Sequence, residues 1–372
     1  MTSVHSYLDT RIFFKECCSL AQSGYETHLV APDAPDQTRN GVHLHGLQKI
    51  ARNRLVRIMN TPWSVYRKAQ RIDAVIYHFH DPELIPVGLL LKAQGKRVIY
   101  DVHEHVPRQI MSKPWIPWWL RTFIAYIVSL IEAIGVHFFD GIVTVTPTIA
   151  RRFPPHKTVV VQNFPMVSEL MVFDPTPYNQ RPLCAIYIGA ITHIRGIREM
   201  LQAIDLVRDQ FDVQLLLVGN FDSAELEQES SKLAGWQKVN FLGWQSRDSV
   251  ARILAQSRVG LVILHPVANY IDSQPNKLFE YMSASIPIIA SNFPKWKGII
   301  ERTGCGLTVD PCDPRAIARA IEFVLAQPQA AEVMGRRGRA AIERQYNWEQ
   351  EVTNLLRFYE KILNASTYTD VP

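Results

Sequence analysis

The fold is indicated first by one stretch of the chain, DSQPNKLFEYMSASIPIIAS, which covers residues 272–291. Pro275 suits the first turn of a helix over Asn276–Ser283, because a proline loses no hydrogen bond there. The apolar run Ile286–Ala290 that follows is typical of a strand buried on both faces. A helix that leads directly into a buried strand is the repeating unit of a parallel α/β sheet.

The same alternation of short apolar runs and helical patterns continues along the whole chain. Gly, Pro, Asp or Asn bound these runs, which favours strands, and Ser246 is a candidate N-cap for the helix before Gln256. In the first half the predicted strands are His28–Val30, Val42–Leu44, Ala74–Tyr77, Arg97–Tyr100, Ile142–Val145 and Val159–Val161. In the second half they are Ala185–Ile188, Gln214–Val218, Val239–Leu242, Gly260–Leu264, Ile286–Ala290 and Leu307–Val309.

Prolines and polar residues interrupt this rhythm once, over residues 166–181. We therefore predict an N-terminal Rossmann-like domain over residues 1–165, a linker over 166–181 and a second Rossmann-like domain over 182–345. Residues 346–372 are predicted to form a helix that packs back on the first domain. Parallel sheets bind ligands beyond the carboxyl ends of their strands, so we expect the two domains to face each other across a ligand-binding cleft.

The N-terminus departs from this pattern, because polar residues lead directly into the first helical pattern. A parallel α/β domain is expected to open with an apolar strand. We therefore expect the first strand to be missing or reduced to a stub. We also expect the N-terminal half to be less stable than a variant with a short apolar extension. No basic-then-apolar signal sequence is recognised at this end.

Composition describes an ordered globular protein of 372 residues, 47% of them hydrophobic and 20% charged. The formal net charge of +5 is too small to require nucleic acid, but it suits an anionic ligand or an anionic membrane face. The five cysteines form no C-x-x-C pair, which favours free thiols in a reducing cytoplasm.

A candidate anion site lies in the second half, within Tyr187–Met200. Gly189 permits a tight turn after a strand, and the helix that begins near Gly196 directs its free N–H groups at an anion. Arg195 precedes this helix, and Lys277 lies on the first turn of the helix in the opening stretch, so the two side chains can hold one diphosphate. A plain strand–helix connection remains an alternative for this turn.

The acids of the opening stretch, Asp272 and Glu280, are candidates for sugar recognition, because a carboxylate accepts hydrogen bonds from two hydroxyls. The alternative is a helix cap and a surface ion pair with Lys277. In the first half, ionisable residues follow two predicted strands. They are His78, His80, Asp81, Glu83, Asp101, His103, Glu104 and His105.

No metal site is predicted. His80 and Asp81 could form a pair of ligands, but no third ligand lies at a convincing spacing, and the chain has no D-x-D motif.

The segments PNKLFEYMSASIPIIAS, YIGAITHIRGI and LLLVGN resemble the nucleotide-sugar domain of the family 4 retaining glycosyltransferases, which have the GT-B fold. The resemblance extends over nearly the whole chain. It implies that Glu280 holds the nucleotide ribose, that Asp272 faces the donor sugar and that His103 lies against that sugar. The implied donor-binding residues are Gly189, Arg195, Gly219, Asn276, Lys277, Leu278 and Glu280. The implied acceptor-side residues are His5, His80, Asp81 and Glu104.

The chain departs from the family pattern in three places. Ala190 stands where the family has a phosphate-binding Arg, Arg195 stands where it has a Lys, and Lys277 is the candidate for the missing charge. Asp272 replaces the usual Glu and is shorter by one methylene. The N-terminal loop SVHSYLD lacks the glycines of many relatives.

The resemblance implies a metal-independent, retaining hexosyltransferase that moves a sugar from a nucleotide-diphosphate sugar to a saccharide or polyprenyl-linked acceptor during cell-envelope polysaccharide assembly. The alternatives are a catalytically impaired relative that only binds a nucleotide-sugar or a partner, and a hydrolase or epimerase of the same fold. Within Lys113–Gly141, tryptophans precede a long apolar helical pattern. We predict a cytoplasmic enzyme with peripheral membrane contact through Trp115, Trp118 and Trp119, the alternative being a core helix.

Overall fold

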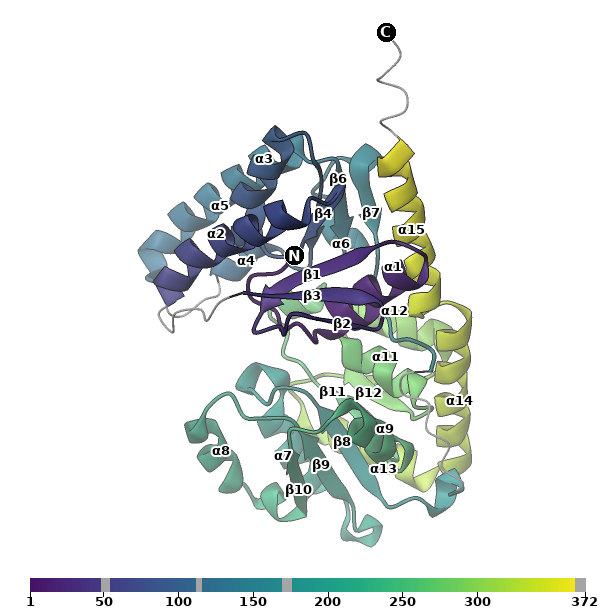
Figure 1. Cartoon of the computed structure of the whole chain (residues 1–372). Helices are drawn as coiled ribbons and strands as arrows, with labels where there is room; N and C mark the ends of the chain where they lie inside the picture. The colour runs from purple at the N-terminus through teal and green to yellow at the C-terminus, as the bar shows by residue number, and fades with distance from the viewer. Residues whose placement is uncertain (48–53, 112–115, 169–175, 365–372) are drawn as a thin grey trace. The chain divides into compact units, whose positions relative to one another are not determined.

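A computed structural model describes residues 1–47, 54–111, 116–168 and 176–364. The chain divides into two compact units (Figure 1). Unit 1 comprises Met1–Asn163 and Glu349–Pro372, and unit 2 comprises Phe164–Trp348. Each unit has its own parallel strands and its own core.

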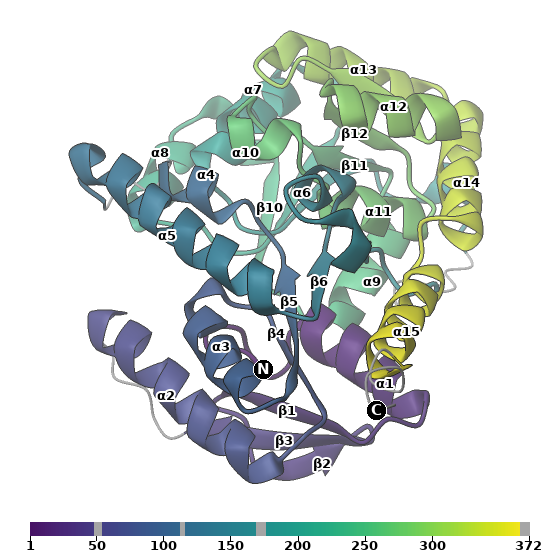
Figure 2. The same ribbon diagram turned by 90° about the horizontal axis from the view of Figure 1, so that it is seen from above.

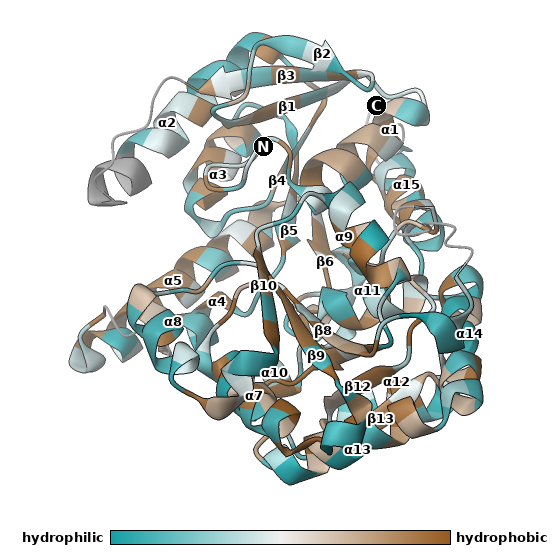
Figure 3. Ribbon diagram, turned by 90° about the horizontal axis from the view of Figure 1, so that it is seen from below, coloured by the Kyte–Doolittle hydropathy of each residue, from teal (hydrophilic) through white to brown (hydrophobic). Residues whose placement is uncertain are grey.

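Unit 2 contains a six-stranded sheet in the order β10-β9-β8-β11-β12-β13, with all strands parallel. The first strand in sequence lies at the centre, so the order of strands reverses between β8 and β11, as in a Rossmann fold. Strands β8, β11 and β12 are buried along nearly their whole length, as expected where helices cover both faces of a sheet, and β8 is coloured as hydrophobic in Figure 3. Their bounds are Cys184–Ile188 (β8), Gln214–Val218 (β9), Val239–Gly243 (β10), Val259–Val262 (β11), Ile288–Ser291 (β12) and Gly306–Val309 (β13).

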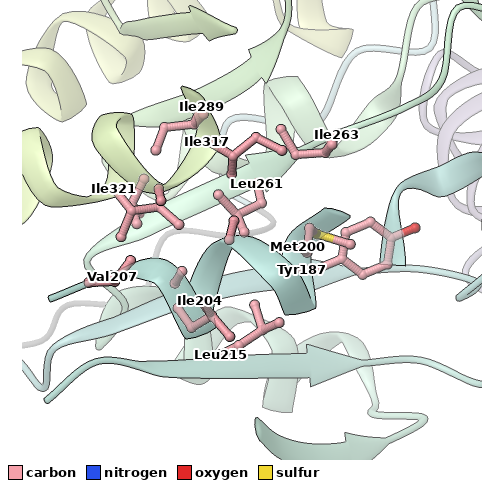
Figure 4. Packing of buried hydrophobic residues seen from close by; sticks show 14 of the residues in the cluster. Tyr187, Met200, Ile204, Val207, Leu215, Leu261, Ile263, Ile289, Ile317 and Ile321 are labelled. Carbon is pink, nitrogen blue, oxygen red and sulfur yellow. The ribbon is translucent and has the colours of Figure 1, made fainter. Parts of the chain in front are cut away.

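Two hydrophobic clusters lie on the two faces of this sheet. On one face, Met200 of α7 and Ile317 and Ile321 of α13 pack over β8 and β11 (Figure 4). On the other face, residues of α9, α11, α12 and α14 pack around Trp296, which is fully buried. The helices are Ile197–Leu206 (α7), Ala224–Ser231 (α8), Arg247–Ala255 (α9), Ala268–Ile271 (α10), Asn276–Ser283 (α11), Pro294–Thr303 (α12), Pro314–Ala326 (α13) and Pro328–Arg344 (α14). Short 3-10 turns cover Tyr178–Gln180, His193–Arg195, Asp209–Phe211 and Ala234–Lys238.

Unit 1 holds two sheets. A four-stranded parallel sheet has the order β4-β5-β6-β7, and a smaller sheet has the order β1-β3-β2 with β2 antiparallel to β3. The strands are Thr27–Pro32 (β1), Gln37–Arg39 (β2), Val42–Leu47 (β3), Ile76–Phe79 (β4), Arg97–Val102 (β5), Gly141–Thr144 (β6) and Thr158–Val160 (β7).

The helices of unit 1 cover these sheets (Figure 2). The chain opens with a π-helix, Thr10–Cys17 (η1), whose N-cap Asp9 accepts from the backbone of Arg11 and Ile12. The other helices are Cys18–Gln22 (α1), Arg54–Ile72 (α2), Ile85–Ala93 (α3), Val106–Met111 (α4), Trp118–Phe138 (α5), Pro147–Ala150 (α6) and Trp348–Asn364 (α15), with 3-10 turns at Pro82–Leu84 and Pro155–Lys157.

Helix α15 returns the chain to unit 1. A Cβ atom at Gly141 of β6 would lie 2.7 Å from side-chain atoms of both Phe358 and Ile362, so any larger residue here requires these side chains to shift. Tyr359 Oη lies 2.8 Å from His78 Nδ1.

Every predicted strand overlaps an observed one, and the predicted helix Asn276–Ser283 and the N-cap Ser246 are confirmed. Seven of the strand boundaries were wrong by two or three residues. Strand β4 begins at Ile76 rather than Ala74, and β12 begins at Ile288, after Pro287, which has no N–H for a strand pair. The short strand β2 was not predicted, since all three of its residues are exposed and polar.

The predicted linker is partly outside the described residues, which omit 169–175. Its described part is not a free connection. Tyr178 is 5% exposed within the core of unit 2, and its hydroxyl donates to the carbonyl of Arg258 at 2.6 Å.

Residues 1–9 contain no strand, as the sequence led us to expect. Met1 and Thr2 nevertheless hydrogen-bond to both sheets of unit 1. The α-amino group of Met1 donates to His78 O at 2.6 Å, the Met1 carbonyl accepts from His80 N at 3.2 Å, and Thr2 N donates to Val30 O at 3.0 Å. A cavity of about 400 Å³ beside them is lined by Thr27, His28 and Val30 of β1 and by Ile76, Tyr77 and His78 of β4, among others.

Candidate functional site

In unit 2 the crevice predicted by strand order lies beyond the carboxyl ends of β8 and β11, where ligands bind in folds of this type. Strand β8 is followed by Gly189, and the segment after β11 leads into α10 and α11. The two parts of the motif predicted from the sequence therefore meet at one edge of one sheet.

Glycines after β8 and β9 allow two turns to pack backbone against backbone. Gly189 has φ +120° and Gly219 has φ +137°, which side chains other than glycine rarely adopt. A Cβ atom at Gly219 would lie 2.1 Å from the carbonyl oxygen of Gly189. Close packing and the backbone angle thus both require glycine at position 219, whereas at position 189 the backbone angle alone does.

Two cations converge on Gly189. A Cβ atom built there would lie 3.5 Å from Lys277 Nζ and 3.6 Å from Arg195 Nη1. The Arg195 guanidinium is held by Tyr270 Oη at 3.4 Å and by the Ala190 carbonyl at 3.4 Å. The structure therefore brings together the pair of basic residues that the sequence predicted, although they are 82 positions apart in the chain.

Lys277 is held in an unusual environment. Its side chain is partly exposed along its length, but Nζ is shut off from solvent and has no hydrogen-bond partner among the described residues. Nζ lies 3.6 Å above the ring centroid of Tyr187, a cation–π contact. Burial lowers the pKa of Lys277 well below its ordinary value, Arg195 lowers it further, and Glu280 opposes both. An ammonium that lacks an acceptor beside a second cation is an anion-binding arrangement.

The helix that carries Lys277 also places the other motif residues. Leu278 is fully buried in the core, so it anchors the helix, whereas Asn276 is exposed on the first turn. Glu280 lies one turn further on and accepts from Arg247 Nη1 at 2.7 Å. The surface pair considered for Glu280 with Lys277 is not formed, and Arg247 of α9 was not expected as its partner.

Asp272 lies apart from this group, in the loop between α10 and α11. The residue is exposed, and its carbonyl oxygen accepts from Lys295 Nζ at 3.5 Å. The indole of Trp296 donates to the carbonyl of Ser273 at 2.8 Å. A fully buried tryptophan therefore fixes the loop and presents Asp272 to solvent.

In unit 1 the candidate residues gather around the buried carboxylate of Asp101. Its Oδ2 lies 3.3 Å from His103 Nε2, 3.4 Å from His80 Nδ1 and 3.0 Å from Arg11 Nη2. Burial alone would raise the pKa of Asp101, but Arg11 and the imidazoles hold it well below its ordinary value. Burial lowers the pKa of His80 to about 4, so this imidazole is neutral near pH 7. His103 is 21% exposed and is therefore oriented from inside the unit while part of its ring reaches solvent.

A second group of predicted residues lies beside the first. Asp81 Oδ1 pairs with His5 Nδ1 at 3.0 Å, and its Oδ2 accepts from Thr2 Oγ1 and Ser3 N. The hydrogen bond that His5 donates to Asp81 raises the pKa of His5. The predicted pair of His80 and Asp81 is therefore divided between two groups. Glu104 is exposed and accepts from Gln109.

The sequence missed two partners of this cluster, Arg11 and Glu16, and it named His78 only as one of the ionisable residues near a strand end. One ligand atom from each of Glu16, His78, His80 and Asp101 lies within 4.8 Å of the others. These are chemically suitable metal ligands, but Arg11 pairs with Glu16 at 2.9 Å as well as with Asp101. The guanidinium thus contacts both acids, but its single charge balances only one carboxylate, and burial raises the pKa of Glu16 well above its ordinary value. The sequence signal that could have identified Arg11 is the presence of an arginine on the apolar face of the first helix.

Comparison with known proteins agrees with this geometry. The model of the glycosyltransferase family 4 matches residues 14–164, and the model described as glycosyl transferases group 1 matches residues 183–327. The chain belongs to the family 4 glycosyltransferases.

Among the relatives of this family 4 glycosyltransferase is spore coat protein SA of Bacillus subtilis, 25% identical over 185 residues, 47% of this chain and 48% of the relative. The chain thus spans about half the length of the curated relatives that it matches.

Solved structures show its GT-B fold. Sucrose-phosphate synthase from Thermosynechococcus elongatus superimposes with a TM-score of 0.76 at 20% identity and covers 98% of this chain and 95% of its own. Anabaena HepE in complex with UDP gives a TM-score of 0.67 at 12% identity and covers 92% and 95%.

Proposed function

We propose that this protein is a retaining, metal-independent hexosyltransferase that transfers a sugar from a nucleoside-diphosphate sugar to a saccharide or polyprenyl-linked acceptor of the cell envelope. The observation that carries the proposal is the buried, unpartnered ammonium of Lys277 beside Arg195 at the Gly189 turn. HepE, a structure of the same fold, was solved with UDP. A nucleoside diphosphate has the charge and the length that two adjacent cations beside strand ends can hold.

Cleavage of the bond between sugar and diphosphate leaves negative charge on the phosphate. Lys277 and Arg195 stabilise that charge where it develops, and the low polarity around Nζ strengthens the interaction. Two fixed cations take the role that a divalent ion has in other transferases, so the reaction requires no metal. Retention follows from a front-face route in which the leaving phosphate takes the acceptor proton.

The acids have separate roles in this proposal. Glu280 binds the ribose hydroxyls while Arg247 holds its carboxylate in place at 2.7 Å. Asp272, presented to solvent by its loop, binds hydroxyls of the donor sugar. In unit 1, Asp101 orients His103, the histidine of the family motif, and His5, His80, Asp81 and Glu104 belong to the acceptor side.

The acceptor is inferred from α5. One helix in the described residues, Trp118–Phe138, is long and apolar enough to span a membrane, with only 22% of its apolar window buried. One side of α5 packs on α3, since Gly135 lies against Ile85, so we propose that the helix lies on the membrane surface at its cytoplasmic face. Its exposed apolar residues are Trp118, Trp119, Phe123, Tyr126, Ile127, Leu130, Ile131, Ile134 and Phe138. The third predicted anchor, Trp115, lies outside the described residues.

The test is turnover of a panel of nucleotide-sugars by the purified chain with and without lipid-linked acceptors. Ligands that raise the melting temperature identify the donor first, because a ligand of the native state stabilises it. Transfer to an acceptor supports the proposal. Binding without turnover of any donor favours the alternative, a catalytically impaired relative, which Ala190 in place of the family's Arg makes a specific possibility. Turnover without an acceptor indicates a hydrolase or an epimerase.

A further inference from the structure

A second cluster of ligand-type side chains lies on the small sheet of unit 1, among residues that the proposed transfer does not use. Parallel pairing of β1 and β3 places His28 directly opposite His43. Their rings stack with centroids 4.8 Å apart at 25°. His45 lies two positions along β3, on the same face of the sheet, and Glu26 immediately precedes β1.

The distances are those of a site rather than of scattered histidines. Glu26 Oε1 lies 3.1 Å from His28 Nε2, and one ligand atom from each of Glu26, His28 and His43 lies within 4.8 Å of the others. The His28 side chain is 23% exposed and that of Glu26 is 80% exposed. An ion can therefore enter from solvent without any rearrangement of the core.

Each imidazole is also held by its other nitrogen. His28 Nδ1 lies 2.9 Å from His45 Nε2, and His43 Nδ1 lies 3.0 Å from Oγ1 of Thr38, which is its pairing partner on β2. Both rings are therefore oriented through Nδ1 and keep Nε2 for another ligand. Metal-binding histidines show this arrangement, because the partner at one nitrogen fixes the tautomer and the ring plane for the other.

We propose that Glu26, His28 and His43 bind a divalent transition-metal ion of the zinc class, with His45 and Thr38 as positioning residues. Imidazole nitrogens and a carboxylate suit zinc, cobalt and nickel rather than magnesium or calcium, and three protein ligands leave a further position for water. The nearby cation Lys68 pairs with Asp36 at 3.2 Å, which offsets its charge. In the buried cluster around Asp101, by contrast, Arg11 already occupies the carboxylates.

The experiment measures binding of Zn²⁺ by calorimetry, and of Co²⁺ by its visible absorption, to the full chain without a histidine tag. We expect one equivalent to bind. Glu26→Gln and His43→Asn should abolish that binding, and His45→Ala and Thr38→Val should weaken it by about 10- to 100-fold. The matched control is His193→Asn, which removes a histidine 3.6 Å from Glu229 on the surface of unit 2 and should leave binding unchanged.

Two results would overturn the site. One is no saturable binding by the folded wild-type chain. The other is binding that survives His43→Asn and Glu26→Gln but is lost in His80→Asn, which would place the ion in the buried cluster. Glu26 is exposed, so its substitution tests the site without disturbing the fold.

Discussion

At the scale of single residues, the side-chain nitrogen of Lys277 in unit 2 is buried and has no hydrogen-bond partner among the described residues. Its pKa is lowered because burial and Arg195 disfavour the charged form. A bound diphosphate reverses this balance and raises the pKa. We therefore predict that binding of a nucleoside diphosphate near pH 8 is accompanied by proton uptake, at a pH where the phosphate itself, with a second pKa of about 6, is already ionised.

The measurement is calorimetry in buffers of different ionisation enthalpy. Lys277→Met should abolish the uptake, and Lys277→Ala should weaken the nucleotide by about 1.5–3 kcal/mol, the scale of a hydrogen bond to a charged group. The control is Lys295→Ala, which removes an amine that donates a hydrogen bond to the backbone carbonyl of Asp272. Unchanged affinity in Lys277→Ala would remove this residue from the site.

Asp272 and Glu280 should fail differently. The ribose is common to every donor, so Glu280→Gln should weaken both free nucleotide and nucleotide-sugar. Asp272→Asn should leave nucleotide affinity unchanged and lower turnover, because a contact that strengthens as the sugar gains positive charge acts on the transition state. Asp272→Glu restores the usual family residue and should change which sugar is accepted. Calorimetry and turnover with a donor panel are measured for each variant, and equal small effects would mean that both are ordinary surface acids.

The sequence predicted the residues of the donor motif better than their neighbours. Gly189, Arg195 and Lys277 converge because the motif encodes the turn and the helix that carry them. No signal in the sequence indicates that the ring of Tyr187 lies beneath Lys277, since Tyr187 fits the pattern of a buried strand residue. Arg11 was missed because its partner Asp101 is 90 positions away, and no local pattern specifies such a pair.

At the scale of elements, the first residues of the chain form some of the backbone hydrogen bonds that a strand between β1 and β4 would form. Met1 and Thr2 hydrogen-bond to both β1 and β4, beside a cavity of about 400 Å³. Burial lowers the pKa of the Met1 α-amino group, which shows that its charge is poorly solvated. Backbone pairing and apolar contact would each favour a strand in this place.

We therefore predict that an apolar extension of four residues, such as Val-Ile-Val-Ile, added ahead of Met1 raises the melting temperature. Amide hydrogen exchange should slow in β1 and β4 but not in β9, which lies in unit 2. A Gly-Ser-Gly-Ser extension is the matched control, since it removes the buried charge without adding apolar side chains. If the two extensions gave the same protection, the slot would not be a strand site.

Helix α5 presents its apolar residues outward. Vesicles that contain phosphatidylglycerol should sediment the wild-type chain. The double variant Trp119→Glu/Phe123→Glu should reduce that binding at least tenfold. Both residues are more than 60% exposed, and the substitutions add negative charge to a surface that must enter the membrane interface. Phe323→Glu on α13, 45% exposed, is the control. Equal binding by the two variants would assign the apolar face to another role.

Helices and strands were predictable wherever burial produced a regular pattern of apolar residues in the sequence. Strands covered on both faces read as apolar runs, and β2, which is wholly exposed, left no such signal. The 3-10 turn at Tyr178 was read as linker because a single buried tyrosine among prolines resembles a loop.

At the scale of the whole molecule, the order of the unit 2 strands decides where the chemistry lies. The reversal between β8 and β11 creates one crevice, and both halves of the motif end at it. The sequence predicted a ligand at the carboxyl ends of the strands, because continuous apolar strands imply parallel sheets with helices on both faces, but it did not predict the strand order. It could not supply the pairing of the histidines on β1 and β3, which depends on strand register.

The two proposals for this molecule, metal-free transfer and a surface metal site, make a joint prediction. In the proposed transfer, Lys277 and Arg195 provide the charge that a divalent ion would otherwise bring to the diphosphate, and Arg11 pairs with both buried acids of unit 1. The proposed ion at Glu26, His28 and His43 lies on the small sheet of unit 1 and contributes to neither group. A chelator should therefore remove bound zinc, as checked by elemental analysis, and leave the initial rate of sugar transfer unchanged. His43→Asn should likewise lose zinc and keep the wild-type rate.

If the chelated chain lost its activity and recovered it with magnesium or manganese, metal-independent transfer would be wrong. If zinc alone restored the rate, and only in chains that retain His43, the surface site would be coupled to catalysis.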